Sequence, residues 1–372
     1  MPKVSIVAAT YNHEKFIAQA IESIQTQTFQ DWELIIVDDC STDGTLELAK
    51  SFSDTKIKVL SNSSNFGLGH TANTGFAAAQ GSYLAWIATD DVFEPEYLRL
   101  FVEALDQSPD CVAVFGKSLL IDESGRSLER YFGNESASLN RFQKLRTLFF
   151  GSNTYCSPGV MFRREVLEEI GYLNPCLRQL QDMDTWVKAL FLGDFKVLAD
   201  VVVRQRVRDN QENMSSPGAA NQRRCRFEML QMMDHYVERI SSFEVLVNIF
   251  PELENDLPPG KADTRVIPYL LANLILRIGE LQSYHRLWAL NQLHRLLADS
   301  ETAALLQSAF GFSYPQLAEL IGREVIFAED ADSRVLELSS SICALKSEVQ
   351  ALATPRPGDS TLFSRVLRKL KL

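Results

Sequence analysis

Short apolar runs alternate with helix-like segments over residues 1–115, and this alternation is the feature that most constrains the fold. The segments between the runs carry apolar residues at helical spacing, and residues 71–80 fit a helix that Gly81 ends as the C′ residue. Strands that alternate with helices favour a sheet with right-handed crossovers. We therefore predict an α/β fold with a mostly parallel sheet. The expected strands are 4–9, 33–37, 57–60, 83–88 and 112–115.

Polar side chains follow three of the expected strands. Thr10-Tyr11-Asn12 ends the first strand, Asp38-Asp39 ends the second, and Thr89-Asp90-Asp91 ends the fourth. In open α/β sheets, ligands bind beyond the carboxyl ends of the strands. Because parallel strands bring these ends to one edge, the sequence predicts a binding site there.

The pattern changes near residue 215, where strand signals fade and helical spacing dominates. We predict an α/β domain over 1–215, a helical accessory region over 216–330, and a last part over 331–372 with a helix, a linker and a basic amphipathic tail. The tail, 362–372, fits peripheral contact with an anionic membrane. Packing, oligomerisation or a frayed end is the alternative. The helical region is also a candidate for a homo-oligomer contact.

Charge and cysteine usage narrow the class of protein. The formal net charge of −11 disfavours a nucleic-acid binder, which needs an excess of Lys and Arg. Six cysteines form no CxxC pair, and no apolar stretch has the length of a membrane span, so we expect a reduced, cytoplasmic compartment. The sequence contains no GxSxG, P-loop or GxGxxG motif and gives no support to hydrolase, ATPase or dinucleotide oxidoreductase classes.

Six segments, in order, resemble the family 2 glycosyltransferases with the GT-A fold: VSIVAATYN, QTFQDWELIIVDDCSTDGT, NFGLGHTANTG, GSYLAWIATDDVFEP, QDMDTWVKALFLG and RQRVRDNQENMS. The resemblance covers residues 1–215. It implies a Rossmann-like sheet flanked by helices and inverting transfer from a nucleotide diphosphate sugar, with a UDP-sugar favoured, in the presence of Mn²⁺ or Mg²⁺. The implied acceptor is a hydroxyl of a glycan, a lipid-linked or a protein-linked molecule in surface polysaccharide or glycan biosynthesis.

The acids after the fourth strand are the candidate metal site. Carboxylates repel a diphosphate but can hold a divalent cation that binds it and stabilises it as it leaves. The resemblance makes Asp91 the metal ligand and places Asp90 beside it in the nucleotide-sugar site. The alternative is that both acids only end a strand and cap a turn. Ala88 stands where many members have a further Asp.

The donor's base is expected near the first two strand ends. The resemblance implies that Asp39 accepts a hydrogen bond from the base, that Tyr11 stacks on it or lines it, and that Thr10 belongs to the same nucleotide-sugar site. An aromatic ring offers a stacking face to any base. The alternative for Tyr11 is a half-buried core aromatic. For Asp38, stabilisation of a turn and of the following helix is the expected role.

Inverting transfer needs a general base that takes the proton of the acceptor hydroxyl. The resemblance assigns this role to Asp182, in a Gln181-Asp182 pair where the family has Glu-Asp or a similar pair. Gln181 removes one like charge beside the base, which keeps the pKa of the base lower. A helix N-cap is the alternative role for Asp182.

Two arginines near residue 207 are candidates for phosphate contacts. Arg206 and Arg208 can pair with phosphate oxygens, and Arg208 stands where many relatives have His; a solvated basic turn is the alternative. Ala72 replaces a common Arg. These departures leave open a scaffold or binding protein with weakened catalysis. A nucleotidyltransferase is a third class, but the segment VAATYNHEKF lacks its Gly-rich phosphate loop.

Overall fold

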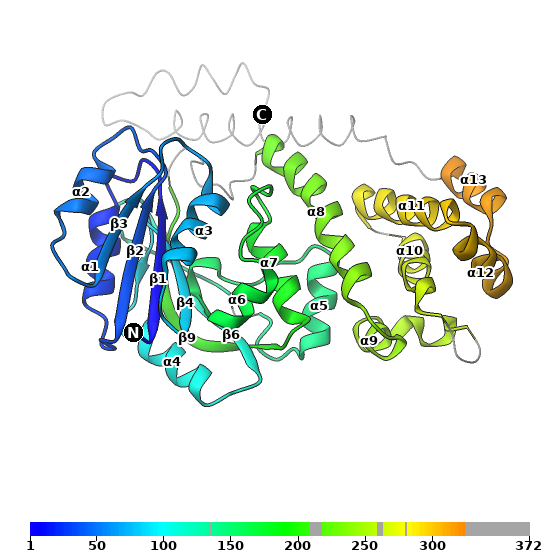
Figure 1. Cartoon of the computed structure of the whole chain (residues 1–372), viewed down its shortest axis with the longest axis horizontal. Coiled ribbons are helices and arrows are strands. Elements are labelled where there is room, and N and C mark those ends of the chain that lie inside the picture. The colour runs from blue at the N-terminus through cyan, green and yellow to red at the C-terminus, as the bar shows by residue number, and fades with distance from the viewer. Residues whose placement is uncertain (134, 209–217, 259–262, 280, 324–372) are drawn as a thin grey trace, which may run out of the picture.

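The computed structural model describes residues 1–133, 135–208, 218–258, 263–279 and 281–323, and Figure 1 shows their arrangement. A twisted sheet with helices on both faces forms the N-terminal part, and helices alone form the C-terminal part beside it. The strands are β1 (Val4–Thr10), β2 (Trp32–Asp38), β3 (Ile57–Ser61), β4 (Tyr83–Ala88), β5 (Val92–Phe93), β6 (Cys111–Ile121), β7 (Ser127–Phe132), β8 (Val160–Arg163) and β9 (Asp194–Arg206). The α-helices are α1 (Ile17–Gln25), α2 (Thr45–Ser51), α3 (Leu68–Ala78), α4 (Tyr97–Asp106), α5 (Arg141–Phe149), α6 (Arg164–Ile170), α7 (Gln181–Leu190), α8 (Ala219–Arg239), α9 (Phe243–Ile249), α10 (Ile267–Arg277), α11 (Ser283–Ala298), α12 (Ser300–Phe310) and α13 (Tyr314–Arg323).

The described strands form one mixed sheet in the order β3-β2-β1-β4-β8-β6-β9-β5, with β7 paired to β6. Strands β1 to β4 are parallel, and β8 lies antiparallel between β4 and β6. Strands β6 and β9 therefore run in the direction of β1 to β4, while β5, β7 and β8 run against it. This arrangement confirms the predicted α/β class with a mostly parallel sheet and a helical C-terminal region.

All five expected strands are present, but the fifth is only the start of the longer β6. The helix predicted over 71–80 is α3, which begins at Leu68 and ends at Ala78, so Gly81 is not its C′ residue. Gly81 serves close packing instead, since a Cβ there would lie 2.5 Å from the Ser5 nitrogen. Ser5 Oγ accepts a hydrogen bond from the Gly81 N–H at 2.7 Å. Gly81 is needed because the loop before β4 passes so close to the backbone at the start of β1 that no side chain fits between them.

One buried apolar cluster joins the sheet to the helical region. It runs from Val7 on β1 through Trp186 on α7 and Tyr236 on α8 to Leu317 on α13. Tyr236 also donates a hydrogen bond to the Leu145 carbonyl oxygen at 2.6 Å. The helices after residue 218 therefore pack on the same core as the sheet. The boundaries at 215 and 330 stay predictions.

The predicted helix, linker and tail over 331–372 lie outside the described residues. Within the part of the chain that is described, no helix has both the length and the apolar character needed to cross a membrane.

Candidate active site

The polar ends of β1, β2 and β4 meet at one edge of the sheet. Strand β1 lies between β2 and β4, with Thr10 in register with Asp38 and Ala9 in register with Ala88. The Asp39 N–H donates to the Thr10 carbonyl oxygen at 2.8 Å. The structure therefore brings together the three polar clusters that the sequence places after these strands.

Asp39 is a buried carboxylate that orders a neighbouring loop. Its Oδ1 accepts hydrogen bonds from Asn62 Nδ2 at 2.8 Å and from the Phe66 N–H at 2.9 Å, and its Oδ2 accepts from the Gly67 N–H at 2.8 Å. Burial raises the pKa of Asp39, but these hydrogen bonds outweigh it and the net pKa is lowered. Asp39 is therefore ionised at neutral pH. A carboxylate has about four acceptor positions, so capacity for a base N–H remains.

Two aromatic side chains are exposed at this edge. Phe66 belongs to the loop whose N–H groups bond to Asp39, and it is 50% exposed. Its ring packs on the His70 ring with centroids 4.7 Å apart. Tyr11 is 42% exposed. Tyr11 is thus exposed and does not belong to the buried core. Stacking on a base stays a prediction.

Asp90 and Asp91 form an adjacent pair of buried carboxylates. Asp91 is 3% exposed, and its Oδ1 accepts a hydrogen bond from the Arg206 N–H at 2.8 Å. Burial and then the charge of Asp90 raise the pKa of Asp91 well above its usual range, although Arg206 opposes this. Two buried like charges this close favour a cation between or beside them. Their oxygens are the donors that Mg²⁺ and Mn²⁺ prefer.

Within the described residues, no three His, Cys, Asp or Glu side chains cluster as a metal site. The oxygens of Asp90 and Asp91 fit a divalent cation and leave coordination positions open to diphosphate oxygens and water.

Arg206 is a buried residue that contacts both Asp90 and Asp91. The residue is 2% exposed, and its guanidinium donates to the Asp90 carbonyl oxygen at 2.8 Å and to Gln19 Oε1 at 2.7 Å. It also donates to the carbonyl oxygens of Asp122 and Glu123 at 3.2 and 2.9 Å. This geometry favours a role in positioning Asp90 and Asp91 over the expected direct contact with the diphosphate.

Arg208 contacts His13 at the same edge of the sheet, and His13 is a residue to which the sequence alone assigned no role. His13 Nε2 lies 3.2 Å from Arg208 Nη1, and His13 Nδ1 lies 2.7 Å from Thr89 Oγ1. Thr89 Oγ1 in turn donates to Thr10 Oγ1 at 2.8 Å. Burial lowers the pKa of His13, Arg208 lowers it further, and Asp90 opposes them, with a net lowering. A neutral imidazole can accept from Arg208 and donate to Thr89. The only signal in the sequence was that His13 follows Tyr11-Asn12.

Asp182 is the second residue of α7 and is half-buried. It accepts hydrogen bonds from Asn153 Nδ2 at 3.1 Å and from the Met183 N–H at 2.7 Å. Burial raises the pKa of Asp182 to about 6, against the lowering effect of these hydrogen bonds. The N-cap position belongs to Leu180, so the alternative N-cap role for Asp182 is wrong. A carboxylate with this pKa is suited to general base catalysis near neutral pH.

Helix α7 is held in place by a turn before it and by packing against β4. Gln181 is buried beside Asp182, and its Nε2 donates to the Leu177 carbonyl oxygen, so it closes the turn before α7. The rings of Trp186 and Trp86 stack with centroids 5.5 Å apart. Trp86 Nε1 also donates to Ser157 Oγ at 3.3 Å, four residues after the Asn153 that contacts Asp182. Helix α7, which carries Asp182, is thus packed on β4, the strand that precedes Asp90 and Asp91.

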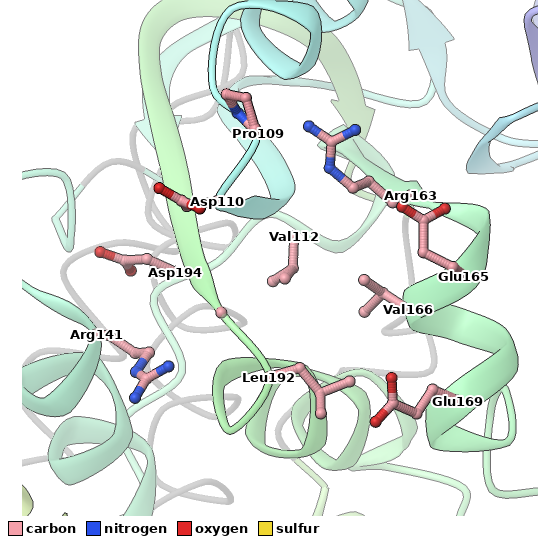
Figure 2. Close-up of a pocket in the computed structure, with 11 residues that line it drawn as sticks. Pro109, Asp110, Val112, Arg141, Arg163, Glu165, Val166, Glu169, Leu192 and Asp194 are labelled. Carbon is pink, nitrogen blue, oxygen red and sulfur yellow. The ribbon is translucent and has the colours of Figure 1, made fainter.

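A cavity of about 600 Å³ lies elsewhere in the fold, and Figure 2 shows its lining. Asp110 precedes β6 and Asp194 begins β9, so the cavity opens at the amino ends of these strands. That is the edge opposite to the one that carries Asp39 and Asp91. Arg163, which also lines it, donates to the carbonyl oxygens of Leu105, Ser108 and Cys111. The cavity is therefore separate from the candidate active site.

The topology and the acidic strand ends define a glycosyltransferase of GT-A architecture. The chain belongs to the family 2 glycosyltransferases: the family model "Glycosyl transferase family 2" matches residues 5–171. The match ends before Asp182, Arg206 and Arg208.

Two relatives in sequence support this assignment, and one solved structure supports the fold. The putative teichuronic acid biosynthesis glycosyltransferase TuaG of Bacillus subtilis is 30% identical over 194 residues, which cover 52% of this chain and 73% of TuaG. An uncharacterized glycosyltransferase of Nostoc sp. is 29% identical over 243 residues, covering 63% and 74%. The structure of S. aureus TarS 1-349 in complex with UDP-GlcNAc aligns with a TM-score of 0.53 at 20% identity, covering 84% of this chain and 93% of that one. The last likeness establishes the fold.

Proposed function

We propose that this glycosyltransferase moves a sugar from a nucleotide diphosphate sugar to an acceptor hydroxyl, with inversion at the anomeric carbon. The observation that carries the proposal is the buried pair Asp90 and Asp91 at the carboxyl end of β4, where burial and the charge of Asp90 raise the pKa of Asp91. Such a pair is suited to a divalent cation that a diphosphate shares.

The donor is held at the edge formed by β1, β2 and β4. Tyr11 stacks on the nucleotide base of the donor, Asp39 accepts a hydrogen bond from that base, and Thr10 lines the same site. Arg208, held by His13, faces the diphosphate, and Arg206 acts behind Asp90. A UDP-sugar is the favoured donor, because a uracil ring carries an N–H that a carboxylate can accept, and because the related fold of TarS has been solved with UDP-GlcNAc.

Asp91 is the proposed ligand of Mn²⁺ or Mg²⁺, with Asp90 beside it. When bound, the cation supplies positive charge that stabilises the departing diphosphate. The chain itself contributes the position of the pair, which Arg206 fixes through the Asp90 carbonyl oxygen and through its own N–H to Asp91.

Asp182 is the proposed general base. An oxygen of its carboxylate takes the proton of the acceptor hydroxyl while the acceptor oxygen forms a bond to the anomeric carbon. The bond from that carbon to the phosphate oxygen breaks on the opposite face, and the electron pair leaves with the nucleotide diphosphate. Asn153 orients the carboxylate through its 3.1 Å hydrogen bond.

The acceptor is proposed to be a glycan or a lipid-linked glycan in the assembly of a surface polysaccharide. The printed name of TuaG, which places it in teichuronic acid biosynthesis, supports this class. A cytoplasmic location at the inner face of the membrane belongs to the same proposal and rests on the cysteine usage and the predicted tail.

A donor screen tests the proposal. The full chain is incubated with UDP-, GDP- or dTDP-sugars, Mn²⁺ and a glycan acceptor, and the release of nucleotide diphosphate is measured. Asp91→Ala is expected to lose metal-dependent donor binding, and Asp182→Asn to keep binding but lose transfer. Asp200→Asn, an exposed carboxylate on β9, is the matched control. Full turnover by Asp182→Asn would refute the base assignment. No calorimetric binding of UDP, GDP or dTDP at millimolar concentration with Mn²⁺ would favour the scaffold alternative.

A further inference from the structure

Glu228 on α8 is a buried carboxylate that holds the segment before the base helix. Its side chain is 5% exposed. Oε1 accepts from the Arg178 N–H at 2.9 Å, and Oε2 accepts from the N–H groups of Gln179 and Leu180, each at 2.8 Å. These three residues lead into α7, with Leu180 at the N-cap, so the carboxylate satisfies the N–H groups of this turn and its charge suits the N-terminal end of the helix dipole. The base, Asp182, lies two residues further on.

A second contact ties the same two helices together. Asp184 on α7 is fully buried: its Oδ1 accepts a hydrogen bond from His235 Nε2 on α8, and its Oδ2 forms an ion pair with Lys188 Nζ, each at 2.6 Å. His235 lies seven residues after Glu228, and two turns of helix bring both to the same face of α8. Helix α8 therefore contacts the chain both before Asp182, at residues 178–180, and after it, at Asp184.

Helix α8 is also anchored on its far side. Asp234 accepts hydrogen bonds from Trp288 Nε1 and Gln292 Nε2 of α11, each at 2.7 Å. The helical region therefore holds α8, and α8 holds the segment 178–180. The chain of contacts is continuous from α11 to Leu180, which lies two residues before Asp182.

We propose that Glu228 is a positioning residue for the glycosyl transfer: it fixes the start of α7, and with it the Asp182 carboxylate, against the acceptor hydroxyl. This inference rests on the proposed function, and it makes α8 part of the catalytic machinery instead of an accessory. The reaction needs the base within hydrogen-bond reach of the acceptor oxygen, and a misplacement of about 1 Å can lower the rate by about 100-fold.

The charge of Glu228 gives the role a second consequence. Burial is the main cause of the raised pKa of Asp182, and the negative charge of Glu228 raises it further. Asn153 and the Met183 N–H lower it, and the Cys225 thiol of α8 is a further titratable group that interacts with Asp182. Removal of the Glu228 charge is therefore expected to move the acidic limb of the pH profile to lower pH.

Glu228→Gln tests the inference in the full chain. A glutamine offers one carbonyl oxygen and turns an NH₂ group toward backbone N–H donors, so at least one of the three hydrogen bonds is lost. We expect kcat to fall by up to about 100-fold with little change in KM for the donor. We also expect faster hydrogen exchange at the amides of 178–180 and an acidic limb at lower pH. Glu244→Gln, an exposed carboxylate on α9, is the matched control and should match the wild type.

The outcomes separate this inference from the proposed function. If the wild type transfers sugar and Glu228→Gln keeps the same kcat and the same amide exchange at 178–180, the inference is overturned and the proposed function stands. Loss of UDP binding together with faster exchange throughout the sheet would also overturn it, because Glu228 would then be a general determinant of folding. If the wild type transfers no sugar from any donor, the proposed function fails instead, and the role of Glu228 fails with it.

Discussion

Asp182 is expected to reduce the stability of the folded protein near neutral pH. Burial raises the pKa of this carboxyl from 3.8 to about 6. Since each pH unit corresponds to about 1.4 kcal/mol, ionised Asp182 lowers the free energy of unfolding by about 3 kcal/mol at neutral pH. The side chain is half-buried, so this figure is an upper bound.

The sign of the pH dependence follows from the raised pKa. Above about pH 6 the carboxylate is charged in both states, and the folded state carries the full penalty. As the pH falls below 6, the folded state binds the proton before the unfolded state does, and the penalty shrinks. At pH 4.5 only about 1 kcal/mol remains.

Asp182→Asn removes the charge but keeps the shape of the side chain. It weakens the hydrogen bonding with Asn153, which costs about 1 kcal/mol. We therefore expect the variant to be more stable than the wild type by about 2 kcal/mol at pH 7.5, and about equally stable at pH 4.5. Urea unfolding at both pH values measures the difference, with Asp200→Asn as the control. A variant that is less stable at pH 7.5, or a difference that stays the same at both pH values, would refute the reasoning.

Three further perturbations have defined outcomes. Gly81→Ala should lower the free energy of unfolding by about 1–3 kcal/mol, because its Cβ would meet the backbone of β1, whereas Gly218→Ala has no neighbour within 4 Å and should have little effect on urea unfolding. Arg206→Met should weaken Mn²⁺ binding in the presence of UDP by about 10–100-fold in calorimetry; an equal loss of UDP affinity without metal would instead indicate direct phosphate contact. Chelation with EDTA should stop transfer, and Mn²⁺ or Mg²⁺ should restore it; turnover in EDTA would contradict the role of Asp91.

The edge of the sheet could be predicted because its signals are local. An apolar run that ends in acids identifies both a strand and its carboxyl end, and neighbouring parallel strands then bring Asp39 and Asp91 together. The short antiparallel strand β8 gave no comparable signal, since four residues carry too little pattern to separate a strand from a loop.

The contacts that position the site could not be predicted, because they join residues far apart in the sequence. Arg206 lies 115 residues from the Asp91 that it contacts, and Glu228 lies 48 to 50 residues from its N–H donors. A charged residue in a sequence is most often exposed. Nothing in the local pattern distinguishes Arg206 or Glu228 from the solvated charges around them, and burial alone makes the difference.

The hydrogen bonds of Asp39 to the N–H groups of Phe66 and Gly67 bear on the thermodynamics of donor binding. They order the loop during folding, so its conformational entropy is lost before any nucleotide arrives. A ligand at this edge meets a preorganised surface, and its affinity is not reduced by the entropy of closing a mobile loop. In the proposed reaction, release of the nucleotide diphosphate would likewise leave the loop in place for the next donor.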